Sequence, residues 1–378
     1  MRITLVIGGL GGGGAERVCV NLANAWVERG HHVTILTVSQ NSVRQAYATD
    51  ARVQRRDIGW PRPARHEELN TAEIATTVRG LQEARCVELL TSQLTLLALL
   101  RKSILAQQPD VVVSHLDITN LRVLAAMYET NIPVIVCEHT DATRVAIGAW
   151  GTVRVAMYRW AHAVVTPHAE SAGWLSKYGT TVVNIPNPLV APSNSRVRRN
   201  GGRRRLLALT RLSWEKRPEL VVRAFASIAS EFPDWDFDIY GDGHLRGWIT
   251  NISEKLAPGR IRLHGFTNEP YDVLRYADLF VSTSWVEGFG NSIWEAMACG
   301  VPVVATEAGT AIRSLVRDRV DGMISNDTVP ALARDLATLM RDDVKRGVMS
   351  ERAREVIDRF SLSASLLAWD NLLFEAVK

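Results

Sequence analysis

Residues 1–40 of the chain, MRITLVIGGLGGGGAERVCVNLANAWVERGHHVTILTVSQ, decide its fold class. A mostly apolar strand is predicted over 3–7, a glycine turn follows it, and a helix is predicted over 15–29 because apolar residues recur there at helical spacing. A second apolar strand over 33–38 completes a β-α-β unit. Strands that are apolar on both faces and joined by helices predict a parallel sheet covered on both sides, and therefore an α/β fold.

The same alternation continues along the chain. In the first half it predicts strands over 110–114, 133–137, 162–166 and 181–185 and helices over 117–130, 152–160 and 168–178. In the second half it predicts strands over 206–210, 236–240, 261–264, 278–282 and 301–305, a helix opened by Pro218, and helices from 330 to 377. Two Rossmann-like, doubly wound domains are expected, with ligands bound in an interdomain cleft at the carboxyl ends of the strands.

The composition changes after residue 192, which predicts a domain boundary. Residues 193–205, SNSRVRRNGGRRR, hold six arginines and two glycines and almost nothing apolar. We expect a first domain over 1–192, a basic linker over 193–205 and a second domain over 206–360. The remaining segment, 361–378, is expected to be a helix that packs back on the first domain.

The composition excludes several classes of protein. The 378 residues are 47% hydrophobic and carry 44 Lys+Arg against 40 Asp+Glu, a net charge of +4 that is too small for a protein that wraps nucleic acid. Cys19, Cys86, Cys137 and Cys299 lie far apart with no zinc spacing, which predicts a reduced, cytosolic protein. No apolar stretch approaches the ~20 residues that a membrane span requires.

The glycine turn after the first strand matches G-x-G-x-x-G over Gly9–Gly14. Such a loop lets a diphosphate approach the amino end of the following helix. The second strand ends Val38-Ser39-Gln40, without the acidic residue that a dinucleotide site uses for its ribose. These glycines therefore favour a diphosphate or acceptor loop over an NAD site, with a simple tight turn as the alternative. The loop residues are Gly11, Gly12, Gly13 and Gly14.

Two carboxylates stand out within 285–306, WVEGFGNSIWEAMACGVPVVAT. Glu287 lies on a glycine-rich loop after a predicted strand, and Glu295 lies in the helix that follows. A helix opening near Asn291 directs its positive end toward a phosphate, while carboxylates accept hydrogen bonds from sugar hydroxyls. The pattern predicts a ligand that carries an anion and a polyol. The alternative for Glu295 is structural, because Ser292-x-x-Glu295 is a capping box.

Two cations, Arg211 and Lys216, follow the strand predicted over 206–210, the position that the glycine loop occupies in the first domain. A guanidinium binds a diphosphate bidentately and an ammonium acts as a point charge, so together they suit a departing nucleotide diphosphate. A solvated loop is the alternative.

Four ordered segments resemble the retaining glycosyltransferases of the GT-B fold, specifically the glycosyl transferases group 1 class, also called glycosyltransferase family 4. These segments are GGAERVCVNLANAWVERGHHVTILT, LTRLSWEKRPELVVRAF, IYGDGHLR and EGFGNSIWEAMACGVPVVAT. The likeness covers nearly the whole chain. Thr210 stands where the family usually has glycine and His244 where it often has proline, and neither difference removes a charge.

The resemblance implies a nucleotide-sugar site in the second domain and an acceptor side in the first. It implies that Arg211 and Lys216 bind the donor diphosphate, that Glu295 holds the ribose and that Glu287 meets the sugar hydroxyls. Backbone N–H groups of Phe289, Gly290 and Asn291 would join these contacts. His139 matches a histidine that many members place beside the donor sugar; a packing histidine is the alternative. The implied catalytic residues are Glu287, His139, Lys216 and Arg211, and the implied donor-binding residues are Arg211, Lys216, Phe289, Gly290, Asn291 and Glu295.

The implied activity is a retaining transfer of a hexose or N-acetylhexosamine from a nucleotide sugar, with UDP-sugar preferred, to a saccharide acceptor in cell-surface polysaccharide or glycolipid assembly. No pair of carboxylates suggests a covalent intermediate, so a front-face reaction is expected. No D-x-D pair is placed to hold a divalent ion, and neither a metal nor another cofactor is expected. A sugar-nucleotide epimerase of the same fold, a non-catalytic sugar-nucleotide-binding protein and a dinucleotide oxidoreductase remain as alternatives.

A group of arginines surrounds Trp60 and defines a basic patch. The patch consists of Arg52, Arg55, Arg56, Arg62 and Arg65 around Trp60. With the amphipathic stretch before Gln107, it favours peripheral contact with anionic headgroups or a lipid diphosphate at the inner face of the membrane. An ordinary solvated loop is the alternative. No nucleic-acid partner is expected.

Overall fold

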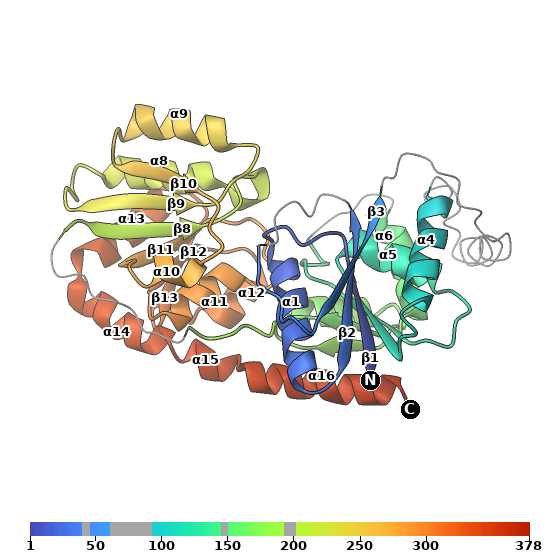
Figure 1. The fold of residues 1–378 in the computed structure, drawn as a ribbon. Coiled ribbons are helices and arrows are strands. Elements are labelled where there is room, and N and C mark those ends of the chain that lie inside the picture. Colours follow the sequence, from blue (N-terminus) through green and yellow to red (C-terminus); the bar gives the residue numbers. More distant parts are fainter. Residues whose placement is uncertain (40–45, 61–92, 145–149, 193–201) are drawn as a thin grey trace. The chain divides into compact units, whose positions relative to one another are not determined.

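The computed structural model describes residues 1–39, 46–60, 93–144, 150–192 and 202–378 (Figure 1). The chain divides into two compact units, each with its own parallel sheet. Unit 1 comprises Met1–Leu189 and Leu362–Lys378, and unit 2 comprises Val190–Ser361.

Unit 1 is built on a seven-stranded parallel sheet in the order β3-β2-β1-β4-β5-β6-β7. Its strands are β1 (Arg2–Ile7), β2 (His32–Ser39), β3 (Gln54–Trp60), β4 (Val111–His115), β5 (Val134–Cys137), β6 (Ala163–Thr166) and β7 (Val182–Asn184). Its helices are α1 (Gly14–Glu28), α4 (Leu94–Leu105), α5 (Asp117–Ala126), α6 (Trp150–Met157), α7 (Ala169–Ser176) and α16 (Leu362–Ala376), with a 3₁₀ turn over Tyr158–Trp160. The strand order reverses between β1 and β4, the switch point of a doubly wound sheet.

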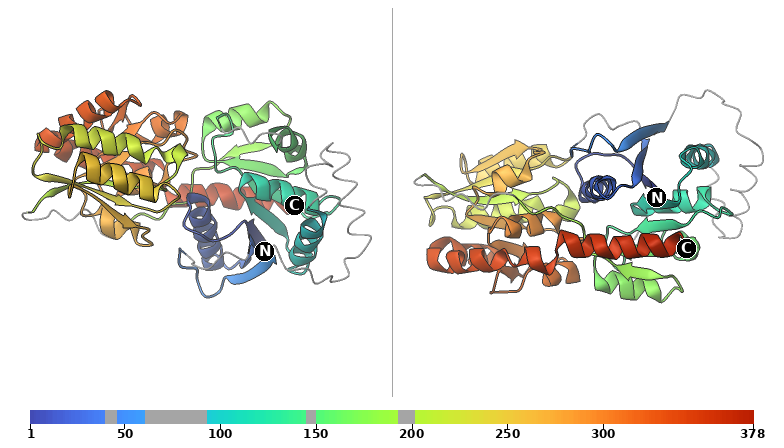
Figure 2. Two further views of the ribbon diagram at one scale, coloured as in Figure 1. Left: turned by 90° about the horizontal axis from the view of Figure 1, so that it is seen from above. Right: turned by 60° about the horizontal axis from the view of Figure 1, so that its bottom comes forward.

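The two faces of this sheet are covered by different helices (Figures 1 and 2). Ile3 and Leu5 of β1 belong to the apolar cluster that contains residues of α1 and α16, whereas Val6 belongs to the cluster that contains residues of α4, α5 and α7. This alternation follows from the two-residue period of a strand. Trp26 of α1 and Trp369 of α16 meet edge to face with ring centroids 5.7 Å apart, so the last helix of the chain is part of the core of unit 1.

Unit 2 repeats this topology with six parallel strands in the order β10-β9-β8-β11-β12-β13. Its strands are β8 (Arg204–Leu209), β9 (Trp235–Tyr240), β10 (Ile261–Gly265), β11 (Leu279–Ser282), β12 (Val303–Thr306) and β13 (Gly322–Ser325). Its helices are α8 (Pro218–Ile228), α9 (Arg246–Leu256), α10 (Pro270–Leu274), α11 (Asn291–Ala298), α12 (Thr310–Leu315), α13 (Val329–Arg341), α14 (Asp343–Ala353) and α15 (Val356–Arg359), with a 3₁₀ turn over Trp214–Lys216. One face of the sheet packs against α8, α9 and α13. The switch point lies between β8 and β11.

The structure confirms the predicted α/β class and adds elements that the pattern did not reveal. The sequence predicts only a basic patch around β3, because the strand begins with the polar residues Gln54–Asp57. The structure shows a charged edge strand that pairs with β2 and exposes those four residues. The stretch before Gln107 is helix α4, whose apolar side chains lie in the core of unit 1. No described helix combines the length and the apolar character that a membrane span needs.

Candidate functional site

The carboxyl ends of β8 and β11 bring Lys216 and Glu287 into contact. The ammonium Nζ of Lys216 lies 2.7 Å from Oε1 of Glu287, and the Ser284 hydroxyl donates to the same oxygen at 2.5 Å. The two side chains are 23% and 13% exposed, so the pair is partly screened from water and remains open to a ligand. These predicted site residues therefore lie together at the switch point of unit 2.

Hydrogen bonds to backbone carbonyls hold the β8 and β11 loops together. The Thr283 hydroxyl donates to the carbonyls of Lys216 and Arg217 at 3.0 and 2.9 Å, and the Trp285 amide donates to the Glu215 carbonyl at 2.8 Å. Arg217 adopts a left-handed conformation with φ 45° immediately before Pro218 opens α8. The pairing of Lys216 with Glu287 is consequently set by the local fold rather than by two free surface side chains. Thr283 and Ser284 are site residues that the sequence patterns did not identify.

Arg211 is on the same loop but is more exposed than Lys216. Its guanidinium lies 3.8 Å from the Glu215 carboxylate and its side chain is 62% exposed. Partial burial raises the pKa of Glu215, but a bond from the Ser213 hydroxyl and the charges of Arg211 and Lys216 outweigh it, so the pKa lies below its ordinary value. The loop thus presents two cations and one ionised carboxylate.

Two glycines of the GDG turn after β9 support this loop. A Cβ at Gly241 would lie 1.8 Å from the Thr210 carbonyl oxygen, and one at Gly243 would lie 2.3 Å from the Leu212 carbonyl oxygen. Gly241 also has φ 141°, which side chains rarely adopt. The backbone of the turn therefore packs directly on the backbone that carries Arg211.

Helix α11 begins beside the Glu287 loop. Its N-cap is Gly290 with φ 89°, and no side chain caps it. Because Ser292 is the second helical residue and not the N-cap, the capping box between Ser292 and Glu295 is absent, and that prediction is wrong. Glu295 is 4% exposed and does interact within the chain. Asn291 is the first residue of the helix, and Phe289 is buried against Phe360, with ring centroids 5.5 Å apart.

In unit 1 the glycine loop leads from β1 into α1 as predicted, and neighbouring side chains bind it. The helix begins at Gly14 with Gly13 as its N-cap, and the Tyr47 hydroxyl donates to the Gly12 carbonyl at 3.1 Å. The Ser39 amide and hydroxyl both donate to the Gly8 carbonyl, each at 2.9 Å. A Cβ at Gly11 would meet no atom within 4 Å, so open space surrounds this position.

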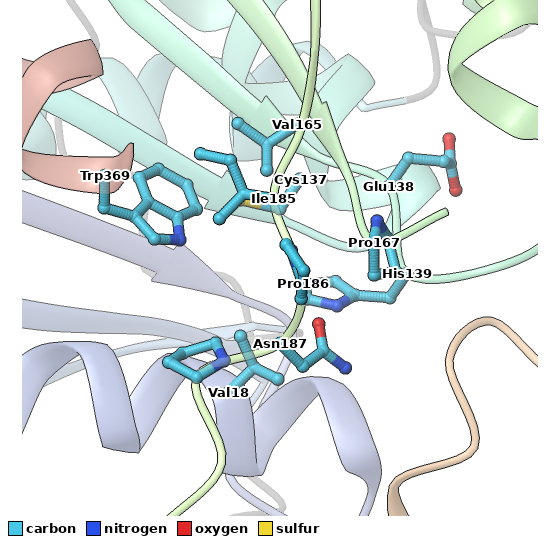
Figure 3. Close-up of a pocket in the computed structure, with 11 residues that line it drawn as sticks. Val18, Cys137, Glu138, His139, Val165, Pro167, Ile185, Pro186, Asn187 and Trp369 are labelled. Atoms are coloured by element: carbon cyan, nitrogen blue, oxygen red, sulfur yellow. The ribbon is translucent and has the colours of Figure 1, made fainter. Parts of the chain in front are cut away.

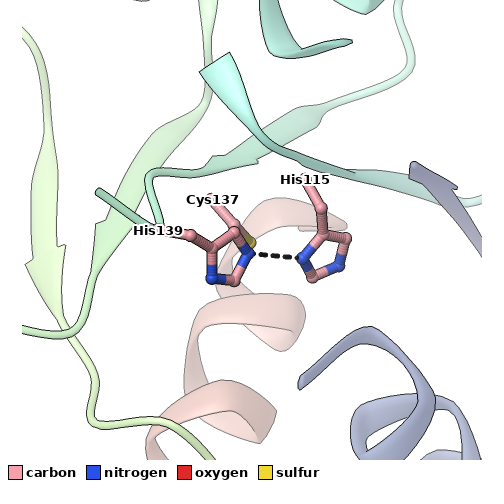
Figure 4. Close-up of side chains that lie close together, drawn as sticks. All are labelled: His115, Cys137 and His139. Atoms are coloured by element: carbon pink, nitrogen blue, oxygen red, sulfur yellow. Dashed lines mark hydrogen bonds between the residues drawn. The ribbon is translucent and has the colours of Figure 1, made fainter. Parts of the chain in front are cut away.

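His139 lies just after β5, and its Nε2 is 2.9 Å from Nδ1 of His115, the last residue of β4 (Figure 4). His115 pairs in register with Cys137, which brings all three side chains together. Burial, with a smaller contribution from His139, holds the pKa of His115 well below its usual range, and burial lowers the pKa of His139 to about 4. Both imidazoles are therefore neutral near pH 7.

The ligand atoms of His115, Cys137 and His139 all lie within 4.8 Å of one another. This set of two imidazoles and a thiol suits zinc in its chemistry. However, the two ring nitrogens already share a hydrogen bond, and burial raises the pKa of the Cys137 thiol well above its usual range. A cation would have to displace that proton and ionise a buried thiol, so we assign no ion to this cluster.

His139 also borders a small cavity in unit 1, together with Asn187 and Trp369 (Figure 3). The preceding residue, Glu138, accepts hydrogen bonds from the hydroxyls of Tyr158 and Thr140 at 2.8 and 2.9 Å. Burial raises the pKa of Glu138, although the nearby Arg154 opposes this effect. The buried Glu138 network fixes the backbone on which His139 is carried.

The described residues include part of the basic patch, namely Arg52, Arg55, Arg56 and Trp60. Arg55 and Arg56 are exposed on β3, but Arg52 is bound to Asp50 at 2.8 Å. Trp60 packs against the apolar cluster of unit 1. Arg62 and Arg65 lie outside the described residues, as does Cys86. Cys19, Cys137 and Cys299 are buried free thiols.

Two family models match the chain. The model described as Glycosyltransferase Family 4 matches residues 12–190, and the model described as Glycosyl transferases group 1 matches residues 193–356. The chain belongs to the group 1 glycosyltransferases. The two matches together cover Gly12–Gly14 of the glycine loop and His139 in unit 1 and the Lys216 and Glu287 loops in unit 2.

Individual group 1 relatives extend the comparison. The chain is 23% identical over 385 residues to the GalNAc-alpha-(1->4)-GalNAc-alpha-(1->3)-diNAcBac-PP-undecaprenol alpha-1,4-N-acetyl-D-galactosaminyltransferase of Campylobacter jejuni, covering 99% of both proteins. It is 30% identical over 167 residues to the poly(ribitol-phosphate) alpha-N-acetylglucosaminyltransferase of Staphylococcus aureus, which is 43% of this chain and 34% of that protein.

Solved structures show that this group 1 glycosyltransferase has the GT-B fold. A structure of S. aureus TarM in complex with fondaparinux, alpha-GlcNAc-glycerol and UDP has a TM-score of 0.76 at 14% identity, covering 98% of this chain and 99% of that chain. Anabaena HepE in complex with UDP and glucose has a TM-score of 0.76 at 18% identity, with the same coverage.

Proposed function

We propose that the protein transfers a hexose or N-acetylhexosamine from a UDP-sugar to a saccharide acceptor with retention at the anomeric carbon. The contact between Lys216 and Glu287 carries this proposal, because it places a phosphate-binding cation 2.7 Å from a carboxylate that can accept from sugar hydroxyls. The pair lies at the switch point of unit 2, where open α/β sheets bind their ligands. The names of the relatives specify alpha-linked products, and retention converts an α-linked UDP-sugar into an α-glycoside.

The proposed reaction takes place on one face of the sugar. The bond between the anomeric carbon and the β-phosphate oxygen breaks while the acceptor oxygen bonds to that carbon, and the acceptor proton passes to the departing phosphate oxygen. Lys216 and Arg211 offset the charge that grows on the diphosphate, aided by the positive end of α11. Glu287, already bound to Lys216 and Ser284, orients the sugar instead of acting as a covalent nucleophile.

We further propose that the transfer needs no metal. Lys216 and Arg211 supply the positive charge that a divalent ion provides in other transferases. Among the described residues, the cluster of His115, Cys137 and His139 is the group close enough to hold an ion. Its nitrogen and sulfur atoms are not the oxygen ligands that Mg²⁺ or Mn²⁺ prefer.

Product analysis tests these proposals. The protein is incubated with UDP-glucose, UDP-N-acetylglucosamine or UDP-N-acetylgalactosamine, with lipid-linked or soluble saccharides, and with or without EDTA. We expect an α-linked product, identified by mass and by its anomeric coupling in NMR, that forms equally in EDTA. A β-linked product would contradict retention, and loss of product in EDTA would contradict metal independence. A changed sugar nucleotide without acceptor would identify an epimerase, and binding without turnover a non-catalytic protein.

We propose a lipid-linked acceptor, because the Campylobacter relative is named for a substrate on undecaprenyl diphosphate. Arg55 and Arg56, exposed on the edge strand β3, would attract the anionic headgroups that surround such a lipid. Flotation with vesicles containing anionic lipid is expected to carry the protein upward at low salt and less so at high salt. Absence of salt-dependent flotation would contradict this docking.

A further inference from the structure

The bond between His115 and His139 has a geometry that constrains both rings. The ring centroids are 5.1 Å apart, the planes differ by 18° and the facing nitrogens are 2.9 Å apart. Such values describe two rings that meet edge to edge in nearly one plane (Figure 4). One nitrogen must therefore donate a proton and the other must accept it, so the tautomers of the two rings are fixed together.

The surroundings of His115 decide the direction of this bond. His115 is fully buried, and its second nitrogen, Nε2, has no hydrogen-bond partner among the described residues. A proton on Nε2 would be a buried donor without an acceptor, the rarer kind of unsatisfied group in native proteins. Placing the proton of His115 on Nδ1 avoids this orphaned donor and supplies the donor that the bond to His139 requires.

We propose that His115 is a positioning residue that donates its Nδ1–H to Nε2 of His139 and so holds His139 as the Nδ1–H tautomer. Nε2 of His139 then acts as an acceptor for His115, and Nδ1 of His139 carries the proton. None of the described residues accepts from that Nδ1. His139 is consequently a ready hydrogen-bond donor to an oxygen of the donor sugar, and this assignment of the ligand rests on the proposed function.

Burial and the neighbouring hydrogen bonds keep His115 and His139 neutral and in place. Both imidazoles stay neutral near pH 7, because burial lowers the pKa of each ring. His139 can therefore donate a hydrogen bond but has no lone pair left with which to remove a proton from an acceptor. Glu138 accepts hydrogen bonds from Tyr158 and Thr140, which hold the backbone beside His139. The backbone on one side and the bond to His115 on the other therefore position the ring of His139.

Nitrogen-15 NMR of the histidine rings in the full-length protein tests the assignment directly. Long-range proton–nitrogen correlations distinguish the Nδ1–H tautomer from the Nε2–H tautomer. We expect Nδ1–H for both His115 and His139 in the wild-type protein. A wild-type His139 in the Nε2–H form would overturn the proposal, and this measurement needs no variant to fold.

Kinetics of two substitutions separate positioning from a merely structural role. His115→Phe removes the donor, and we expect the KM for the UDP-sugar to rise roughly 3- to 10-fold, the effect of one lost neutral hydrogen bond. His115→Asn retains an N–H donor near the position of Nδ1 and should restore a KM close to the wild-type value. An unchanged KM in His115→Phe, or the same loss in both variants, would contradict the proposal.

A control and a binding measurement complete the experiment. His168→Phe replaces another buried histidine of unit 1, one that contacts Ser171, and should leave the KM unchanged. The affinity for UDP alone, which lacks the sugar, should be the same in wild type and His115→Phe. If wild type does not bind UDP, the proposed function fails; if UDP binds normally and the tautomer prediction is not met, only the role of His115 fails.

Discussion

The two units share one topology but place different chemistry at the carboxyl edges of their sheets. In unit 2 the loops after β8 and β11 carry an ion pair, Lys216 with Glu287, that is partly exposed. In unit 1 two neutral histidines are bound to each other, His115 at the end of β4 and His139 just after β5, and a glycine loop follows β1. The same α/β scaffold can therefore offer charge at one sheet and neutral hydrogen bonding at another, depending on the residues at the carboxyl ends of the strands and in the loops that follow them.

The largest expected effect comes from breaking the ion pair of unit 2. Lys216→Ala should lower kcat by about 100-fold or more, because it removes a cation from the charge that develops on the leaving diphosphate. Steady-state transfer assays check this. Lys255→Ala, on the exposed side of α9, is the matched control and should retain wild-type turnover. Unchanged kcat in Lys216→Ala would remove that role from the account.

A second prediction concerns the backbone beneath the charged loop. Gly241→Ala should reduce the free energy of unfolding by roughly 1–3 kcal/mol, because its Cβ would meet the Thr210 carbonyl at an unfavourable φ. Gly247→Ala, in α9 with no atom within 4 Å, is the control and should be neutral or slightly stabilising. Denaturant unfolding measures both. Equal stability of the two variants would show that the packed GDG turn does not constrain the loop.

A third prediction sharpens the roles of the two cations. Arg211→Ala should weaken UDP binding by about tenfold, less than the effect of Lys216→Ala on turnover, because Arg211 is largely exposed and its charge is screened by water. Calorimetric titration with UDP gives the dissociation constant. Arg223→Ala, exposed on α8, should bind UDP as the wild type does. A wild-type constant in Arg211→Ala would assign the diphosphate to Lys216 alone.

The smallest effect is expected from the neutral pair of unit 1. Because the folded state lowers the pKa of His115 and His139, the unfolded chain takes up protons first as the pH falls below about 6.5. The free energy of unfolding that the neutral pair contributes is therefore fully present at pH 7. It is lost as the pH falls through about 6.5 toward pH 5. His115→Phe removes one such group and should lose less stability over this interval, as measured by urea unfolding at both values. Identical losses would contradict the burial of a neutral histidine pair.

Much of this fold could be predicted because its buried strands are mostly apolar, as in β1 and β4. Strand β3 could not be, since its charged residues carry no apolar alternation and its pairing with β2 depends on the folded sheet. Helix α5 ends at Ala126, four residues before its predicted end, because a turn over Met127–Thr130 follows.

The candidate site was predictable where a motif carries the chemistry, as for Lys216 and Glu287. The partnership of His115 with His139 was not, since 23 residues separate them along the chain and only the adjacent strands β4 and β5 bring them together. The capping box at Ser292 was a wrong prediction because the sequence does not fix the residue at which α11 begins. Its spacing is correct, but the helix begins at Asn291, two residues too early for Ser292 to be its N-cap.

The measurement that tests the central claim most directly is calorimetric titration of UDP into wild type, Lys216→Ala and His139→Asn. If the charged loops of unit 2 hold the diphosphate, UDP affinity falls at least tenfold in Lys216→Ala and stays at the wild-type value in His139→Asn. Equal affinity in wild type and Lys216→Ala, or a loss confined to His139→Asn, would contradict the account.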